Sequence, residues 1–298
     1  MPVADLSEYD TITAALEKCA TKLDGGAAAP GYFSRRRRVL FNVLKYAVTK
    51  KRLKNNPIDG LDWKAPDSPC EEVDPSVVAS PEQVRELLTA VSYSGYRRGP
   101  QLVAFYACMY FAMMRPGEVI PLRQEDCHLP ESGWGRLMLG NSRPTVGAEW
   151  TDDGQVQEAR GLKGRPRKAK RPIPIPPELV TILRTHIARY GVAQDGRLFR
   201  TERGGMLQAS AYAHTWKTAR PLALTPAQVA SELARRPYDL RHAGVSMRLN
   251  AGVPATQVAE WAGHSVEVLL KVYAKCVDGQ DHVWRGMLDK ALGAEESA

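Results

Sequence analysis

Between residues 115 and 273 the chain carries five polar side chains whose types together suit the breaking and rejoining of a phosphodiester. They are Arg115, Lys163, Arg241, His264 and Tyr273. In phosphoryl transfer, charge spreads over the non-bridging oxygens in the transition state, and two guanidinium groups can clamp those oxygens without a metal ion. A phenol, with a pKa of about 10, can attack phosphorus and later leave. A lysine can protonate the departing 5′-oxygen, and a histidine can bind the phosphate or move a proton.

Each of these residues also has a structural interpretation when it is taken singly. Tyr273 lies on an apolar helical stripe, which is typical of a core aromatic. That stripe consists of Val266, Leu269, Leu270 and Tyr273. Arg115 and Glu118 could form a local ion pair, and Asp239 and Arg241 could form another at a helix start, on either side of a core leucine. The complete set, rather than any one member, favours chemistry on a phosphate.

The order of the motifs resembles the tyrosine recombinases, the phage-integrase family, and is most similar to integrases of actinobacterial phages and integrative elements. The motifs are Arg-x-x-Glu at 115–118, a hairpin lysine at 163, Asp-Leu-Arg-His at 239–242, Gly-His at 263–264 and a tyrosine nine positions after that histidine. The resemblance covers roughly residues 35–292. It is most specific in the segment PYDLRHAGVSMRLNAGVPATQVAEWAGHSVEVLLKVYAKC.

The resemblance implies a role for each of the five side chains. Arg115 and Arg241 bind the scissile phosphate, and His264 hydrogen-bonds it. Tyr273 attacks and forms a 3′-phosphotyrosyl bond, while Lys163 acts as the general acid for the departing 5′-hydroxyl. The 5′-hydroxyl of a partner strand then reverses the step, so the family needs no nucleotide, metal or other cofactor.

Three further residues are predicted to support the site. Glu118 orients Arg115, and Asp239 belongs to the motif of the second arginine. The family usually has a histidine three positions before that arginine, but here the position is Tyr238, and a phenol is a poor base near neutral pH.

His242 is predicted to be a local hydrogen-bonding or packing residue. Two lysines after Lys163 compete with it for the acid role, namely Lys168 and Lys170.

The pattern of elements predicts a mainly α fold with a small β-sheet, an α+β chain. Helices are expected at 8–23, 34–53, from 81 onward, at 100–114, at 177–190 and from 212 onward. Ser80 and Pro81 provide an N-cap and a first helical residue. The segments 133–140 and 171–177 are expected to be short strands that flank a polar, glycine-rich insertion at 140–157. The apolar stripe of the second helix is expected to consist of Val39, Leu40, Val43, Leu44, Ala47 and Val48.

Composition indicates two domains. Residues 62–80 hold three prolines and five acidic residues, which is typical of a linker. We therefore expect a helical core DNA-binding domain at 1–65, a linker at 66–80 and a catalytic domain at 81–298. The first domain is shorter than in the larger members of the family, so it is expected to be either abbreviated or truncated. The segment 279–292 is expected to form a C-terminal amphipathic helix, which in this family docks on a neighbouring protomer to give a homotetramer on DNA.

The distribution of charge favours a nucleic-acid partner. The net charge is +8, and two blocks, 33–54 with nine Lys or Arg and 160–171 with seven, contain no acid. Such blocks suit phosphate-facing surfaces, although solvated faces are an equally good interpretation of either block alone. The candidate DNA-contacting residues are Arg35, Arg36, Arg37, Arg38, Lys45, Lys50, Lys51, Arg165, Arg167, Lys168 and Lys170.

These observations lead to an expected function and to two alternatives. The expected function is site-specific DNA recombination or integration at attachment-type sites in duplex DNA, with accessory DNA-bending or directionality factors as possible partners. The alternatives are a non-catalytic DNA-binding protein, because 243–262 resembles two helices around a glycine turn, and a type IB-like DNA-relaxing enzyme.

Five cysteines without a Cys-x-x-Cys pair argue against a disulfide framework and a zinc site. Since the sequence has neither a membrane-length apolar run nor a signal peptide, a cytoplasmic protein is expected.

Overall fold

The structure is a computed structural model that describes residues 3–61, 72–151, 154–163, 166 and 169–276, together with 285, 286, 288, 289 and 292. The chain divides into two compact units, Met1–Glu71 and Glu72–Ala298. This division lies inside the predicted linker at 66–80. Most of the predicted C-terminal helix at 279–292 lies outside the described residues. Within the described part, no helix combines the length and the apolar character needed to cross a membrane.

Unit 1 is a pair of helices that follow a short 3-10 turn at Val3–Ser7. The helices are α1, Tyr9–Ala20, and α2, Pro30–Thr49. α1 ends at Ala20 rather than at the predicted residue 23, and Leu23 is fully exposed. α2 begins at Pro30 rather than at residue 34, because proline fits the first turn of a helix, where its missing N–H is not needed. The small core of the unit consists of Ile12, Leu16, Leu44, Leu53 and Ile58.

The buried face of α2 is narrower than its sequence predicts. Leu44 is fully buried and Leu40 packs against the core, but Val39 and Val43 are 64 % and 58 % exposed. Tyr32 and Tyr46 are also exposed, although both are large. Since α1 is the only other α-helix among the described residues of the unit, it covers only part of the apolar surface of α2. The remainder of that surface faces solvent in this structure.

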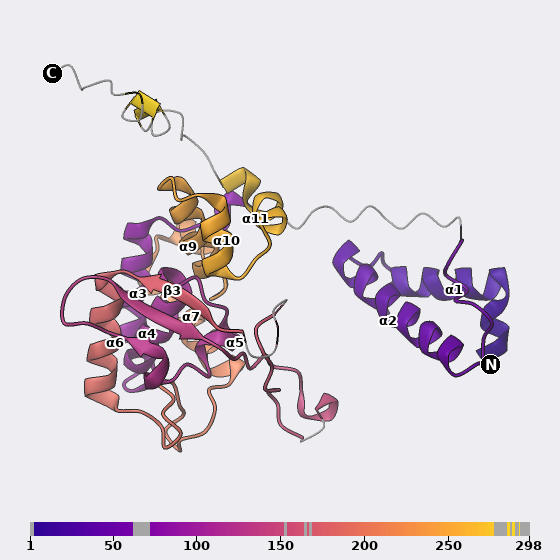
Figure 1. The fold of residues 1–298 in the computed structure, drawn as a ribbon, viewed down its shortest axis with the longest axis horizontal. Coiled ribbons are helices and arrows are strands. Elements are labelled where there is room, and N and C mark those ends of the chain that lie inside the picture. The colour runs from indigo at the N-terminus through magenta and orange to yellow at the C-terminus, as the bar shows by residue number, and fades with distance from the viewer. Residues whose placement is uncertain are drawn as a thin grey trace. The chain divides into compact units, whose positions relative to one another are not determined.

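Unit 2 is built around one helix that is buried on nearly all sides. This helix is α4, Arg98–Phe111, and every residue from Ala104 to Phe111 is buried, as the apolar composition of 100–114 predicts. The surrounding helices are α3 (Pro81–Tyr93), α6 (Pro177–Tyr190), α7 (Ala209–Ala223) and α9 (Asp239–Asn250) (Figure 1). Ser80 and Gln83 form the capping box that starts α3, which confirms the predicted start.

A three-stranded antiparallel sheet lies in unit 2, in the order β1-β2-β3. The strands are β1 (Cys127–His128), β2 (Gly135–Leu139) and β3 (Arg171–Ile175), and Leu137 is opposite Ile173. Side chains alternate along β3, so that Arg171, Ile173 and Ile175 are buried. After β2, residues 142–145 pair with residues 157–160, because isolated bridges join Ser142 to Arg160 and Thr145 to Gln157. The predicted fold class, mainly α with a small sheet, is confirmed.

A group of short helices completes unit 2. They are α5 (Pro116–Val119), α8 (Pro226–Ala230), α10 (Ala255–Ala262) and α11 (Val266–Tyr273), with 3-10 turns at Pro75–Val77, Gln124–Asp126, Ala148–Trp150 and Ala274–Cys276. On α11, Leu269 and Tyr273 are buried, whereas Val266 and Leu270 are 37 % and 54 % exposed. The buried Val73 donates its backbone N–H to Val272 O at 2.7 Å. The later part of the predicted linker therefore belongs to unit 2.

The contact between α4 and α9 predicts a glycine requirement. A Cβ added at Gly244 would overlap the backbone carbonyl oxygen of Tyr110, which cannot move without moving α4. We expect Gly244→Ala to lower the free energy of unfolding by about 2 kcal/mol or more, in the range of other overpacked cores. Gly140→Ala is the matched control, because its Cβ would meet nothing closer than Lys170 Cγ at 4.0 Å. Urea unfolding of both variants checks this, and equal stability of the two would contradict the close packing.

Candidate active site

Arg115 lies at the N-terminal end of α5, just after the buried helix α4. Its Nη1 donates to Glu118 Oε1 at 3.0 Å, and its Nη2 donates to the carbonyl oxygen of Gly263 at 3.0 Å. Glu118 Oε2 also accepts from the backbone N–H of Arg115 at 2.9 Å. The predicted Arg115–Glu118 pair is therefore present. It connects α5 with the turn that follows α10.

Glu118 is shared with a second arginine that the sequence analysis had placed only in a basic block. Arg171 donates from Nη1 and Nη2 to the two carboxylate oxygens of Glu118, at 3.1 and 2.9 Å. Both side chains are 1 % exposed. Burial alone would raise the pKa of the Glu118 carboxyl, but Arg171, Arg115 and Arg241 together outweigh burial and hold that pKa at about 2. The carboxylate therefore stays ionised inside the protein.

Arg241 is fully buried on α9 and is held by carbonyl groups rather than by a carboxylate. Its Nη1 donates to Met113 O, and its Nη2 donates to Ala262 O at 2.7 Å. Met113 has a positive φ of 51°, unusual for a residue with a side chain, in the turn after α4 that presents its carbonyl to Arg241. Burial is the main cause that lowers the pKa of the Arg241 guanidinium, and the charge of Arg115 adds to it. The guanidinium nevertheless stays charged at neutral pH.

Arg115 and Arg241 converge on the turn at Ala262–Gly263. Ala262 O accepts from Arg241 Nη2 at 2.7 Å and lies 3.5 Å from Arg115 Nη1. Gly263 has a φ of 68°, and a Cβ there would overlap the Arg171 guanidinium and lie 3.4 Å from Arg115 Nη1. Only glycine combines this backbone conformation with so close an approach of two arginines, Arg171 and Arg115. Arg115 and Arg241 thus share one site.

His264 follows this turn and contacts Arg241. Its Nε2 lies 2.7 Å from Arg241 Nη2, and a guanidinium can only donate, so Nε2 accepts and Nδ1 carries the proton. Burial, then Arg241 and Arg115, lower the pKa of His264 to about 3, so the ring is neutral at pH 7. Within the described residues, neither the Nδ1 of His264 nor the Nε of Arg241 has a hydrogen-bond partner, and both atoms are buried. The Nε of Arg171 is buried without a partner as well, so three donors of this cluster lack an acceptor among the described residues.

Tyr273 lies beside the cluster on α11 and is both a packed aromatic and a hydrogen-bonded hydroxyl. It is 1 % exposed, and its ring centre lies 6.0 Å from that of His264. Its hydroxyl lies 3.0 Å from Nδ1 of His242. Burial raises the pKa of the Tyr273 phenol, and the opposing effect of Arg241 is smaller. The phenol is therefore protonated at neutral pH, so any reaction of its oxygen as a nucleophile would require a group that takes its proton.

The arrangement suits the binding of one anionic group next to one nucleophile. Three guanidinium groups surround a single carboxylate, which leaves an excess of positive charge around the Gly263 turn. Donors from α5, α9 and the turn before α11 meet there, so that segments far apart in the sequence form one site. Among the described residues, no His, Cys, Asp or Glu side chains are grouped in a way that could hold a metal ion.

Comparison with known proteins rests on structure, because no protein-family model and no curated protein sequence matches the chain. The Tn1549 transposon integrase, solved in complex with circular intermediate DNA, is 16 % identical with a TM-score of 0.65, over 95 % of this chain and 87 % of its own. The XerH site-specific recombinase bound to difH substrate is 12 % identical with a TM-score of 0.60, and the match covers 94 % of this chain and 69 % of the XerH chain. A lambda integrase, solved as a dimer bound to a core site, is 14 % identical with a TM-score of 0.54, and the match covers 89 % of this chain and 81 % of the integrase chain.

The fold is that of the tyrosine recombinases. At these identities the likeness establishes the fold alone. The site described above lies in unit 2, and the structure brings together Arg115, Arg241, His264 and Tyr273, as the motif order predicts.

Other predicted site residues lie apart from this cluster or outside the description. Lys163 is exposed at a turn before β3, and no hydrogen bond or ion pair joins it to the cluster within the described residues. Lys170 is exposed, and Arg165, Arg167 and Lys168 lie outside the described residues. Asp239 is buried and pairs with Arg236 at 3.2 Å, so the predicted ion pair at the helix start has Arg236 as its partner rather than Arg241.

Two residues next to the cluster were missed or given a smaller role. Arg171 alternates with Ile173 and Ile175 along a strand, and this spacing of two could have placed it on the buried face. His242 was interpreted as a local hydrogen-bonding or packing residue, yet its partner is the Tyr273 hydroxyl. Tyr238 packs its ring edge-on against His242, with the ring centres 5.1 Å apart. No sequence signal showed which histidine reaches Tyr273.

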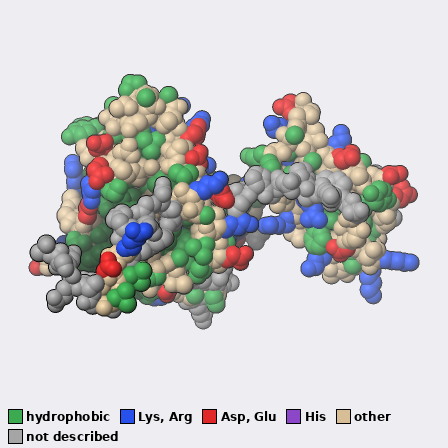
Figure 2. Space-filling view, turned by 90° about the horizontal axis from the view of Figure 1, so that it is seen from above, with side chains coloured by type: hydrophobic (Ala, Val, Ile, Leu, Met, Phe, Trp, Pro, Cys, Tyr) green, Lys and Arg blue, Asp and Glu red, His purple; other side chains and the backbone are tan. Residues whose placement is uncertain are grey.

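The basic residues of α2 are mainly exposed. Arg35, Arg38, Lys45, Lys50 and Lys51 face solvent, and Arg37 is partly buried. Arg36 has a structural task, because its Nη1 donates to Thr21 O at 2.8 Å and to Cys19 O at 3.2 Å, at the C-terminal end of α1. On the face of unit 1 that Figure 2 shows, Lys and Arg side chains project at several places.

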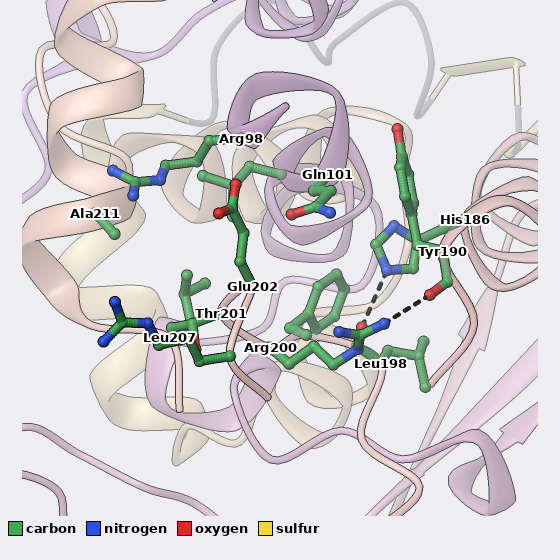
Figure 3. Close-up of a pocket in the computed structure, with 13 residues that line it drawn as sticks. Arg98, Gln101, His186, Tyr190, Leu198, Arg200, Thr201, Glu202, Leu207 and Ala211 are labelled. Atoms are coloured by element: carbon green, nitrogen blue, oxygen red, sulfur yellow. Dashed lines mark hydrogen bonds between the residues drawn. The ribbon is translucent and has the colours of Figure 1, made fainter. Parts of the chain in front are cut away.

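A separate cavity of about 360 Å³ lies elsewhere in unit 2 and includes none of the cluster residues. Figure 3 shows that its walls come from the start of α4, the end of α6 and the segment 198–203. Arg98, Arg200 and Glu202 line it, and His186 donates from Nε2 to Leu198 O at 3.1 Å. The cavity therefore does not contribute to the arginine cluster.

The shared carboxylate predicts an acid-sensitive contribution to stability. The folded pKa of Glu118 is about 2, below its ordinary value of 4.5, so its contribution is present above pH 4.5 and is lost as pH falls towards 2. The difference corresponds to roughly 3 kcal/mol. We expect Glu118→Gln to lower the free energy of unfolding at pH 7 by about that amount or more, and to unfold with a weaker dependence on acid.

Urea unfolding at pH 7 and pH 3 measures both effects. Glu131→Gln is the control, because Glu131 is exposed. If the Glu118 variant has the same free energy of unfolding as the wild type at pH 7, the ion pairs of Glu118 do not stabilise the fold.

Proposed function

We propose that the protein is a site-specific DNA recombinase or integrase that breaks and rejoins DNA strands through a 3′-phosphotyrosyl intermediate. The observation that carries the proposal is the convergence of Arg115, Arg241 and His264 beside the hydroxyl-bearing ring of Tyr273. The resemblance of the motifs to tyrosine recombinases and the fold shared with DNA-bound recombinases and integrases support it.

The electrostatics of the cluster suit a phosphodiester. Arg115 and Arg171 share the charge of Glu118, whereas Arg241 is held by neutral carbonyl groups. A bound phosphate would supply the missing negative charge and the missing acceptors for Arg241 Nε and His264 Nδ1. Both atoms are buried, so a phosphate reaches them only after a segment that covers them has moved.

The reaction follows from these positions. The Tyr273 oxygen attacks phosphorus, the bond to the 5′-oxygen breaks, and the DNA is held by its 3′-phosphate on the enzyme. Arg115, Arg241 and His264 stabilise the charge on the non-bridging oxygens. Lys163, which is exposed, protonates the departing oxygen. A 5′-hydroxyl from another strand reverses the step, so the energy of the phosphodiester is conserved.

The buried position of Tyr273 requires a movement before the reaction. A phenol that is 1 % exposed cannot reach a phosphate of duplex DNA, so α11 has to shift when DNA binds. α11 is a short helix of eight residues whose Val268 and Leu270 are 45 % and 54 % exposed. Since few of its side chains are buried, its displacement costs less than that of a core helix.

Unit 1 is proposed to be the core DNA-binding domain and unit 2 the catalytic domain. The exposed basic residues of α2 would contact DNA phosphates, while Tyr32, Val39, Val43 and Tyr46 on the same helix offer apolar surface. The substrate would be an attachment-type site in duplex DNA. We further propose that the protein assembles on DNA as a homotetramer through the segment 279–292 and works with accessory bending or directionality factors. We place it in the cytoplasm, and we propose that it comes from an actinobacterial phage or integrative element.

The covalent step predicts a tyrosine-dependent product. We expect the wild type, incubated with a pool of nicked duplexes that carry a randomised core, to form protein–DNA complexes that survive denaturation by detergent. Tyr273→Phe should form none, because it lacks the attacking oxygen. Tyr110→Phe is the matched control, since Tyr110 is a buried tyrosine outside the cluster. Denaturing gels measure the product, and sequencing of the recovered duplexes identifies the preferred site.

Two outcomes would overturn this assignment. If the wild type forms no covalent complex with any member of the pool but binds duplexes specifically, the chain is a DNA-binding protein without strand cleavage. If Tyr273→Phe still forms the complex, another residue is the nucleophile.

The basic face of α2 predicts salt-sensitive binding. We expect affinity for duplex DNA to fall steeply between about 50 and about 200 mM salt, because binding releases counterions from the phosphates. Replacing Lys45 and Lys50 together by alanine should weaken binding and reduce the slope of affinity against salt. Replacing the exposed Lys217 of α7 by alanine is the control. Fluorescence anisotropy measures the affinities, and a flat salt response of the wild type would exclude phosphate contacts as the main source of affinity.

A further inference from the structure

His242 connects the helix of the second arginine with the nucleophile. It follows Arg241 on α9, and its Nδ1 lies 3.0 Å from the Tyr273 hydroxyl oxygen, with the ring centres 5.7 Å apart. Within the part of the chain that the structure describes, this is the one hydrogen bond of that hydroxyl. The contact therefore joins α9 to α11 at the atom that would react, and the shift of α11 on DNA binding must keep it.

The protonation state of His242 suits a proton acceptor. Burial, then the charges of Arg241 and Arg236, lower the pKa of His242 to about 4, so the ring is neutral at pH 7. The other groups that face it are the phenols of Tyr238 and Tyr273. A phenol is a stronger acid than a neutral imidazole N–H, so Tyr273 donates and Nδ1 accepts.

The neighbouring candidates are less suited to take the proton of Tyr273. The Nε2 lone pair of His264 already accepts from Arg241 Nη2 at 2.7 Å, and its Nδ1 carries a proton. Tyr238, in the position where the resemblance leads one to expect a histidine, is a phenol and therefore a poor base. Its ring lies edge-on against His242 and thereby fixes the plane of the imidazole. Among the described residues, only His242 combines an available lone pair with hydrogen-bond distance to the oxygen.

We propose that His242 is a catalytic residue that accepts the proton of the Tyr273 hydroxyl as its oxygen attacks phosphorus, an inference that rests on the proposed function. The O–H bond breaks, its electron pair stays on oxygen, and that oxygen forms the bond to phosphorus. The bond from phosphorus to the 5′-oxygen breaks, and this oxygen leaves with its electron pair and takes a proton from the general acid. His242 is then protonated, and it returns the proton to Tyr273 when the incoming 5′-hydroxyl reverses the step.

The test measures the rate of covalent complex formation in a single turnover, on the duplex that the wild type selects from the randomised pool. We expect His242→Ala to slow this rate about 100-fold or more, a typical contribution of a general base, with unchanged affinity for the duplex. His242→Asn should be equally slow, because an amide can hydrogen-bond the phenol but cannot take its proton. Added imidazole should partly restore the rate of the alanine variant. His214→Ala is the control, because His214 is exposed on α7.

A second substrate separates the base from the acid. When sulfur replaces the bridging 5′-oxygen, the leaving group no longer needs a proton, so a defect of the base persists whereas a defect of the acid disappears. The inference is overturned if His242→Ala or His242→Asn reacts at the rate of the wild type, or if the sulfur substrate restores the rate of His242→Ala. These outcomes leave the proposed function intact, which fails instead if the wild type forms no covalent complex or if Tyr273→Phe still forms one.

Discussion

The site depends on the presence of one carboxylate among three buried or half-buried guanidinium groups. Moving an arginine out of water is costly unless its charge is compensated, and Glu118 compensates Arg115 and Arg171 together. Arg241 has no carboxylate partner. Its charge is instead compensated by two backbone carbonyl groups, that of Met113 after α4 and that of Ala262 at the end of α10. The C-terminal ends of helices carry partial negative charge, which suits a guanidinium. One charge is thus left without a carboxylate where a phosphate would lie.

The two histidines of the site differ in role because of what surrounds each ring. Arg241 occupies the Nε2 lone pair of His264, which turns the other nitrogen into a donor without an acceptor. His242, one residue after Arg241 on the same helix, points instead to Tyr273. In the proposed mechanism, a single turn of α9 therefore supplies a group for the phosphate and a group for the nucleophile. The replacement of the usual histidine by Tyr238 is compatible with this division, because Tyr238 packs against His242.

Much of the fold could be predicted because local signals and tertiary contacts agree. Ser80 and Pro81 start α3, and Pro177 to Tyr190 form α6 with the predicted bounds. Periodicity was less informative for α2, because it shows which side chains are apolar but not how many neighbours cover them. Val39 and Val43 are exposed for that reason. The convergence of Arg115, Arg241, His264 and Tyr273 followed from motif order. The part played by His242 depends on the direction of one ring, and spacing does not encode that direction.

The central claim is that Arg115, Arg241 and His264 hold one phosphate of the DNA backbone against Tyr273. The most direct measurement is a crystal structure of the Tyr273→Phe variant bound to the duplex that the wild type selects. We predict a single phosphate that accepts hydrogen bonds from Arg115, from Arg241 and from Nδ1 of His264, with its phosphorus facing the ring of residue 273. A duplex whose phosphates all lie outside this cluster, with Arg241 Nε and His264 Nδ1 still without an acceptor, would contradict the account.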